Sequence, residues 1–159
     1  MSAKPILRFG LIAILAATAG LFLARALLTP RGTPPPATDS ATILPQPRAL
    51  PALTLVDQDG RPLPAGFLRD RWTVVFFGFT QCPDVCPGTL TVLAQMKKEL
   101  ADLPATDQPH VLLISVDPER DTPAVLKAYV TFFDPSFSAA TGTVAGATQA
   151  ATAFSVPFA

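Results

Sequence analysis

The order of apolar and polar positions divides the chain into three segments. A hydrophobic stretch reaches from Ile6 to Leu28, with one arginine near each end. Residues 29–51 follow neither the strand period of 2 nor the helix period of 3.6, and they are rich in proline. We therefore predict a transmembrane signal anchor at residues 1–28, a Pro-rich linker at 29–51 and one globular domain at 52–159.

Two interpretations of the hydrophobic stretch are open. Its uncharged part has about 16 residues and spans only ~24 Å, but the longer span reaches ~34 Å if Arg8 and Arg25 extend to the two membrane interfaces. We favour such an uncleaved anchor over a signal peptide cleaved at Ala24-Arg25-Ala26. In both cases the domain lies outside the cytoplasm, and the proline-rich linker is a semi-rigid spacer.

The globular domain alternates between strand patterns and helix patterns. Trp72–Phe79 and Val111–Val116 are almost entirely apolar, which is typical of strands covered on both faces. Thr122 and Pro123 are typical of a helix cap and a first helical position, and that helix stops at Asp134-Pro135. The other predicted elements are the strands Leu53–Val56 and Phe137–Thr141 and the helices Pro87–Leu103 and Val144–Phe154. This order predicts an α/β fold with parallel strands.

Composition and charge narrow the classes of function. The 159 residues are 49% hydrophobic, enough for one buried core beside the anchor. Lysine and arginine together number 12, as do aspartate and glutamate, so the formal net charge is +0. Because no basic patch matches a phosphate backbone, nucleic acid is excluded as a partner.

The candidate chemistry lies in the two cysteines, Cys82 and Cys86, which follow the Trp72 strand directly. The carboxyl end of a parallel strand is where open α/β sheets bind ligands. Each cysteine precedes a proline, which favours a structured loop. Pro87 fits the first helical position, so we expect Cys86 to be the helix cap, with its thiolate stabilised by the helix dipole.

Several uses of this thiol pair are open. Two convergent thiolates can bind Cu(I) or close into a disulfide. A purely structural disulfide is less favoured, because so short a loop gains little stability from closure. Structural zinc needs four ligands, whereas the chain offers two cysteines and His110. His110 begins the second strand, so we place it at the opposite end of the sheet.

Other conspicuous side chains receive ordinary structural roles. The charged residues that follow the second strand lie on the same rim as the cysteines, but we interpret them as a loop before a helix cap; they are Asp117, Glu119, Arg120 and Asp121. The aromatic residues of the first apolar strand are assigned to the core; they are Trp72, Phe76, Phe77 and Phe79.

Three segments together resemble the SCO/SenC family. They are FFGFTQCPDVCP at Phe76–Pro87, SVDPERDTPAVLKAYVTFFDP at Ser115–Pro135 and ATGT at Ala140–Thr143. The resemblance implies a thioredoxin-like, three-layer α/β/α domain anchored in the inner membrane, with the domain in the periplasm. It implies copper held by Cys82 and Cys86 and passed to the cytochrome c oxidase subunit with the binuclear copper centre, or exchanged with another copper chaperone. The same cysteines would carry a thiol-disulfide oxidoreductase activity, if the family's alternative function applies.

The family pattern implies further segments that would follow Ala159. The resemblance implies a third copper ligand, a histidine in an Asp-His-Ser/Thr segment, beyond Ala159. It also implies a C-terminal β-hairpin and a last helix, with the hairpin paired to the Trp72 strand. We therefore expect an incomplete domain with an open strand edge, marginal in stability, and a nonfunctional fragment is the third hypothesis for this chain.

Overall fold

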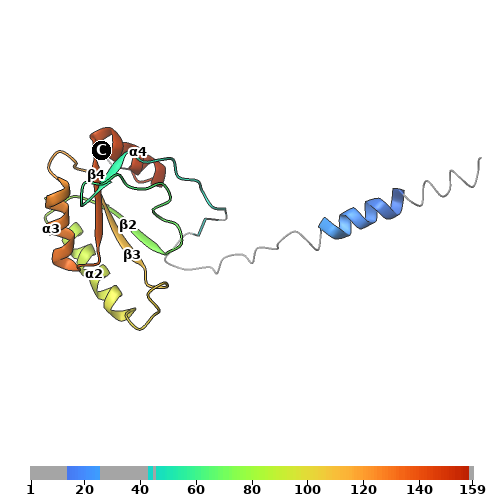
Figure 1. Ribbon diagram of the computed structural model, residues 1–159, viewed down its shortest axis with the longest axis horizontal. Helices are drawn as coiled ribbons and strands as arrows, with labels where there is room; N and C mark the ends of the chain where they lie inside the picture. Colours follow the sequence, from blue (N-terminus) through green and yellow to red (C-terminus); the bar gives the residue numbers. More distant parts are fainter. Residues whose placement is uncertain (1–13, 26–42, 45, 158–159) are drawn as a thin grey trace, which may run out of the picture. The chain divides into compact units, whose positions relative to one another are not determined.

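The computed structural model describes residues 14–25, 43–44 and 46–157 (Figure 1). The chain forms two separate units, Met1–Arg48 and Ala49–Ala159. In the first unit residues 14–25 are helical, and the remainder of the predicted anchor lies outside the described residues, as does most of the predicted linker. Over the described ranges, no helix has both the length and the apolar character that a membrane span requires.

The second unit is built around a four-stranded sheet in the order β1-β4-β3-β2. β2, β3 and β4 run parallel, and β1 pairs antiparallel with β4 (Figure 1). The strands are β1 (Leu55–Asp57), β2 (Thr73–Gly78), β3 (His110–Ser115) and β4 (Ser138–Gly142), and the helices are α2 (Val85–Glu99), α3 (Pro123–Phe133) and α4 (Val144–Phe154). The predicted alternation of strands and helices, with parallel pairing, is therefore confirmed.

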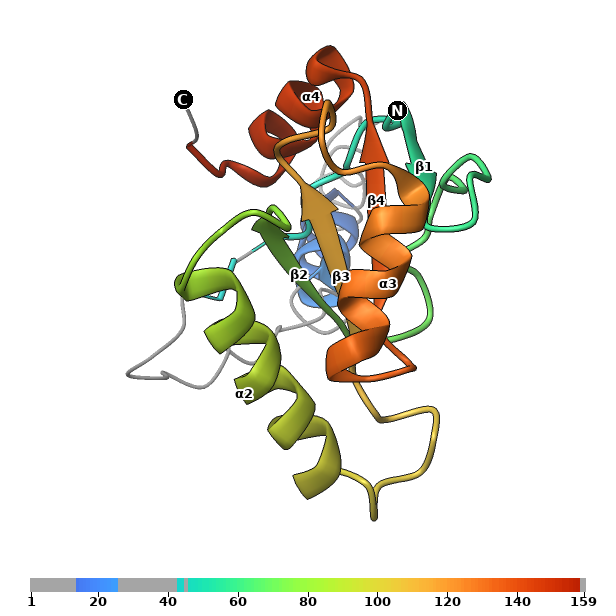
Figure 2. The same cartoon turned by 90° about the vertical axis from the view of Figure 1, so that its left-hand side faces the viewer.

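Helices cover both faces of the sheet. α2 and α3 lie side by side over one face, as Figure 2 shows, and α4 packs against the other. Alternate residues of β3 point to opposite faces of the sheet. Val111 and Leu113 pack in the core under α2 and α3, and Leu112 and Ile114 pack in the core under α4. This alternation explains why Val111–Ile114 is apolar at every position, as predicted for a strand covered on both faces.

Side-chain caps fix the starts of α3 and α4. The Thr122 hydroxyl accepts a hydrogen bond from the backbone N–H of Val125, with Pro123 in the first turn as predicted. Thr143 accepts in the same way from the N–H of Gly146 at 3.1 Å. Thr143 directly follows β4, so the cap of α4 is placed at the end of a sheet strand.

β2 lies at an edge of the described sheet. It pairs with β3 on one side, and no other described strand pairs with it. The open edge expected for this strand is thus present in the described part of the chain. Trp72, predicted as a core residue, is 78% exposed because it precedes the strand at this edge; that prediction was wrong.

Candidate functional site

The two cysteines lie where β2 ends and α2 begins. Cys82 is in the loop and partly exposed, whereas Cys86 is in the first turn of α2 and only 5% exposed. The backbone N–H of Cys86 donates a hydrogen bond to the Cys82 sulfur over 3.4 Å, and the Cys86 thiol donates to the same sulfur. Both cysteines are free thiols. The structure thus brings the predicted pair together at the carboxyl end of the parallel strands.

The pKa values of the two thiols move in opposite directions. The hydrogen bond from the Cys86 thiol is the main cause that lowers the pKa of Cys82, and N–H groups of Cys86, Asp84 and Val85 lower it further. Burial raises the pKa of Cys86 to about 11, and its hydrogen bond to Cys82 raises it too. The stabilised thiolate is therefore Cys82, with Cys86 behind it as a protonated donor.

This assignment corrects the sequence prediction. We expected Cys86 to cap the helix and to be the favoured thiolate, but α2 begins at Val85, with Asp84 at the cap position. Cys86 is consequently inside the first turn, where its side chain is buried against the end of β2. The amides of that turn point at Cys82, so the helix start stabilises the other sulfur.

A buried carboxylate organises the rim beneath the cysteines. Asp121 is 0% exposed and accepts hydrogen bonds from the Ser115 hydroxyl at 2.6 Å and from the hydroxyl and backbone N–H of Thr80. It thereby ties the end of β3 to the loop that carries Cys82. We had interpreted Asp121 as an ordinary loop residue. The sequence did place Asp121 on the same rim of the sheet as Cys82, and this placement was the available indication of its role.

Tyr129 of α3 is a second residue that the sequence prediction missed. Its hydroxyl is buried and has no hydrogen-bond partner among the described residues. Burial raises the pKa of Tyr129, and the charges of Cys86, Cys82 and Asp121 raise it further. The ring itself packs against the core under α2 and α3. Nothing in the sequence distinguished this tyrosine from a core aromatic residue.

His110 lies at the other end of the sheet, as predicted. It pairs with Thr73 at the start of β2, whereas Cys82 follows Gly78 at the end of that six-residue strand. The separation is ~20 Å at about 3.3 Å per residue. In the described part of the chain, no three His, Cys, Asp or Glu side chains are grouped in a way that can hold a metal ion.

The comparisons with known proteins identify the family. A family model described as SCO1/SenC matches residues 43–159. The chain belongs to the SCO1/SenC family. Its thioredoxin-like fold resembles that of solved Sco proteins: copper-bound yeast Sco1, with a TM-score of 0.65 and 33% identity over 71% of this chain and 62% of that one, and copper-bound ScoI of Bradyrhizobium japonicum, with a TM-score of 0.61 and 34% identity over 68% of each.

Two curated relatives show how much of their length matches this chain. A protein of Stutzerimonas stutzeri, named a putative copper-binding protein, is 41% identical over 118 residues, which cover 73% of this chain and 56% of the relative. The mitochondrial SCO2 homolog of Bos taurus is 37% identical over 103 residues, covering 65% of this chain and 39% of the relative. The match thus spans about half or less of the length of these relatives.

Proposed function

We propose that this SCO1/SenC chain is a copper chaperone for the assembly of cytochrome c oxidase, and that Cys82 and Cys86 bind Cu(I) as its cargo. Members of the family have been solved with copper bound, and one is described as belonging to a family of cytochrome c oxidase assembly proteins. The periplasmic face of the inner membrane is the proposed location. The subunit with the binuclear copper centre is the proposed recipient.

The observation that carries this proposal is the convergence of the two sulfurs. Cys82 and Cys86 are in hydrogen-bond contact, and both are free. Cu(I) is a soft ion that prefers thiolate ligands, and the N–H groups around Cys82 compensate its negative charge. Binding requires Cys86 to lose its proton, so copper uptake by this pair releases protons to the solvent.

A titration of the reduced full-length chain with Cu(I) under anaerobic conditions tests the proposal. We expect one tightly bound equivalent in the wild type and a loss of tight binding in Cys82→Ser, because a hydroxyl is a poor ligand for Cu(I). Gln81→Ser, an exposed neighbour in the same loop, is the matched control and should bind as the wild type does. Unchanged affinity in Cys82→Ser would reject the thiol pair as the site.

The opposite pKa shifts favour a second candidate function, thiol-disulfide exchange. The Cys82 thiolate would attack a substrate disulfide and release one substrate thiolate. Cys86, after losing its proton, would then attack the Cys82 sulfur, release the second substrate thiolate and leave a Cys82–Cys86 disulfide. Two electrons pass to the substrate. Reduction of a peptide disulfide by one equivalent of the metal-free chain, followed by mass spectrometry, distinguishes this function from copper binding.

A further inference from the structure

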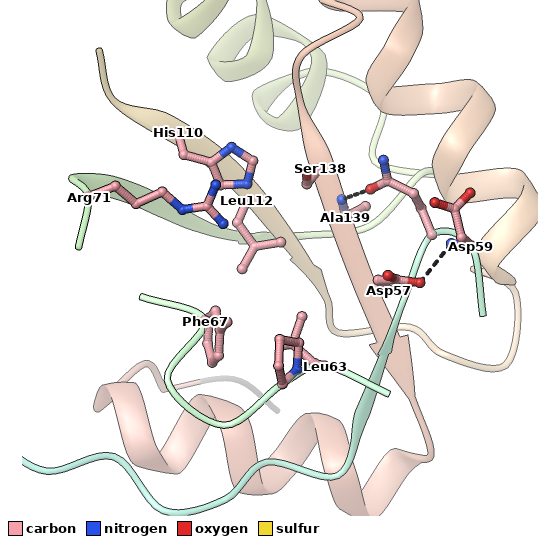
Figure 3. A pocket seen from close by; sticks show the side chains of 11 residues that line it. Asp57, Asp59, Leu63, Phe67, Arg71, His110, Leu112, Ser138 and Ala139 are labelled. Atoms are coloured by element: carbon pink, nitrogen blue, oxygen red, sulfur yellow. Dashed lines mark hydrogen bonds between the residues drawn. The ribbon is translucent and has the colours of Figure 1, made fainter. Parts of the chain in front are cut away.

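The end of the sheet opposite the cysteines contains a cavity of about 240 Å³. Its walls come from the starts of β3 and β4, from the turn after β1 and from the segment that leads into β2 (Figure 3). It lies ~20 Å from the thiol pair, the length of the strands between them. The cavity is therefore a separate site, and it has no part in the copper chemistry proposed above.

One wall of the cavity is basic. The side chains of Arg71 and His110 lie beside each other there (Figure 3). Across the described residues, neither has a carboxylate within ion-pair distance. Burial lowers the pKa of His110, and the positive charges of Arg71 and Lys97 lower it further. An anion on this wall would counter the charge of Arg71 and would favour the protonated form of His110.

The carboxylates on the opposite wall are already satisfied. Asp57 accepts hydrogen bonds from the backbone N–H groups of Asp59 and Arg61, both at 2.9 Å. Asp59 pairs with Lys127 at 2.7 Å and with Arg61 at 3.4 Å, and the hydrogen bond from Lys127 lowers the pKa of Asp59. Asp59 therefore has its own counter-charges and Asp57 is satisfied by backbone N–H groups, whereas Arg71 lines the cavity without a carboxylate partner among the described residues.

Between the two walls the lining is apolar. Leu63, Phe67 and Leu112 contribute it, and Figure 3 shows them facing the same space. A cavity of about 240 Å³ leaves room for a small ligand with a short hydrocarbon chain. We propose that this cavity binds a small organic anion, with its carboxylate between Arg71 and His110 and its hydrocarbon chain against Leu63, Phe67 and Leu112. Hexanoate has the matching size and chemistry.

The chain contains one histidine, so every ring signal of labelled histidine reports on His110 at the wall of the cavity. When sodium hexanoate is added to the reduced full-length chain, we expect a saturable shift of the His110 signal. The pKa of His110 should rise, because a carboxylate beside the imidazole favours its protonated form. Hexanol should bind at least about tenfold more weakly, since it lacks the charge-assisted hydrogen bonds. Acetate should also bind more weakly, because it lacks the chain.

Arg71→Gln should weaken hexanoate binding by at least about tenfold. The exposed Arg69, in the same segment but outside the cavity, supplies the control Arg69→Gln, which should bind as the wild type does. Cys82→Ser should also bind normally, so this result is independent of the proposed copper function. The proposal is overturned by an unchanged His110 signal, by hexanol binding as tightly as hexanoate, or by unaltered binding in Arg71→Gln.

Discussion

In the reduced protein at pH 8, we expect iodoacetamide to modify Cys82 at least about 100-fold faster than Cys86. The pKa of Cys86 is raised to about 11, so roughly one molecule in a thousand carries this thiolate at pH 8. The pKa of Cys82 lies below its ordinary value of 9.0, so more than about a tenth of this thiol is ionised. Mass spectrometry after short reaction times identifies which residue is modified first.

The dependence on pH supplies the control for this experiment. The rate at Cys82 should reach half of its plateau below pH 9, whereas the rate at Cys86 should continue to rise towards pH 11. In Cys82→Ser, Cys86 should remain slow, because burial is the main cause of its raised pKa. Equal rates, or faster modification of Cys86, would contradict the assignment of Cys82 as the stabilised thiolate.

The second large effect is expected for Asp121→Ala, which should lower the free energy of unfolding by about 3 kcal/mol. The substitution leaves the buried Ser115 hydroxyl and the Thr80 donors without their acceptor, and each unsatisfied group costs about 1–3 kcal/mol. Urea unfolding followed by circular dichroism measures the change, with an unaltered m-value as a check on the transition.

Glu119→Ala is the matched control for Asp121→Ala. Glu119 lies in the same loop but is exposed, so its removal should change stability by no more than about 0.5 kcal/mol. Asp121→Ala should also weaken Cu(I) binding, since Thr80 belongs to the loop that positions Cys82. If the two alanine variants are equally stable, the carboxylate does not hold the rim together.

Much of the fold could be predicted because local patterns and tertiary packing agree. Val111–Val116 is apolar except for Ser115 since both faces of β3 are covered, and Thr122 caps a helix because its hydroxyl accepts a hydrogen bond from the N–H of Val125. Trp72 could not be placed from its residue type. Its exposure depends on β2 lying at an edge of the described sheet, and strand order is decided by contacts distant in sequence.

The candidate site was predicted in part. The spacing of Cys82 and Cys86 after a strand located the pair. It did not show which sulfur accepts hydrogen bonds from the backbone N–H groups at the start of α2. That depends on α2 starting at Val85, and single-residue boundaries are poorly determined by sequence patterns. Asp121 was interpreted as an ordinary loop residue because its role depends on hydrogen bonds to Thr80, a residue in a different loop, and to Ser115.

The close approach of β2 to Cys86 limits what can stand at the strand's last position. A methyl group at Gly78 would lie 3.0 Å from the Cys86 sulfur and 2.9 Å from the ring of Phe76. The backbone of Gly78 therefore forms one wall around the buried sulfur. The buried thiol at Cys86 therefore depends on glycine at position 78. A redesign that keeps this thiol buried should keep both residues, and a search for homologues with the same buried thiol should look for both.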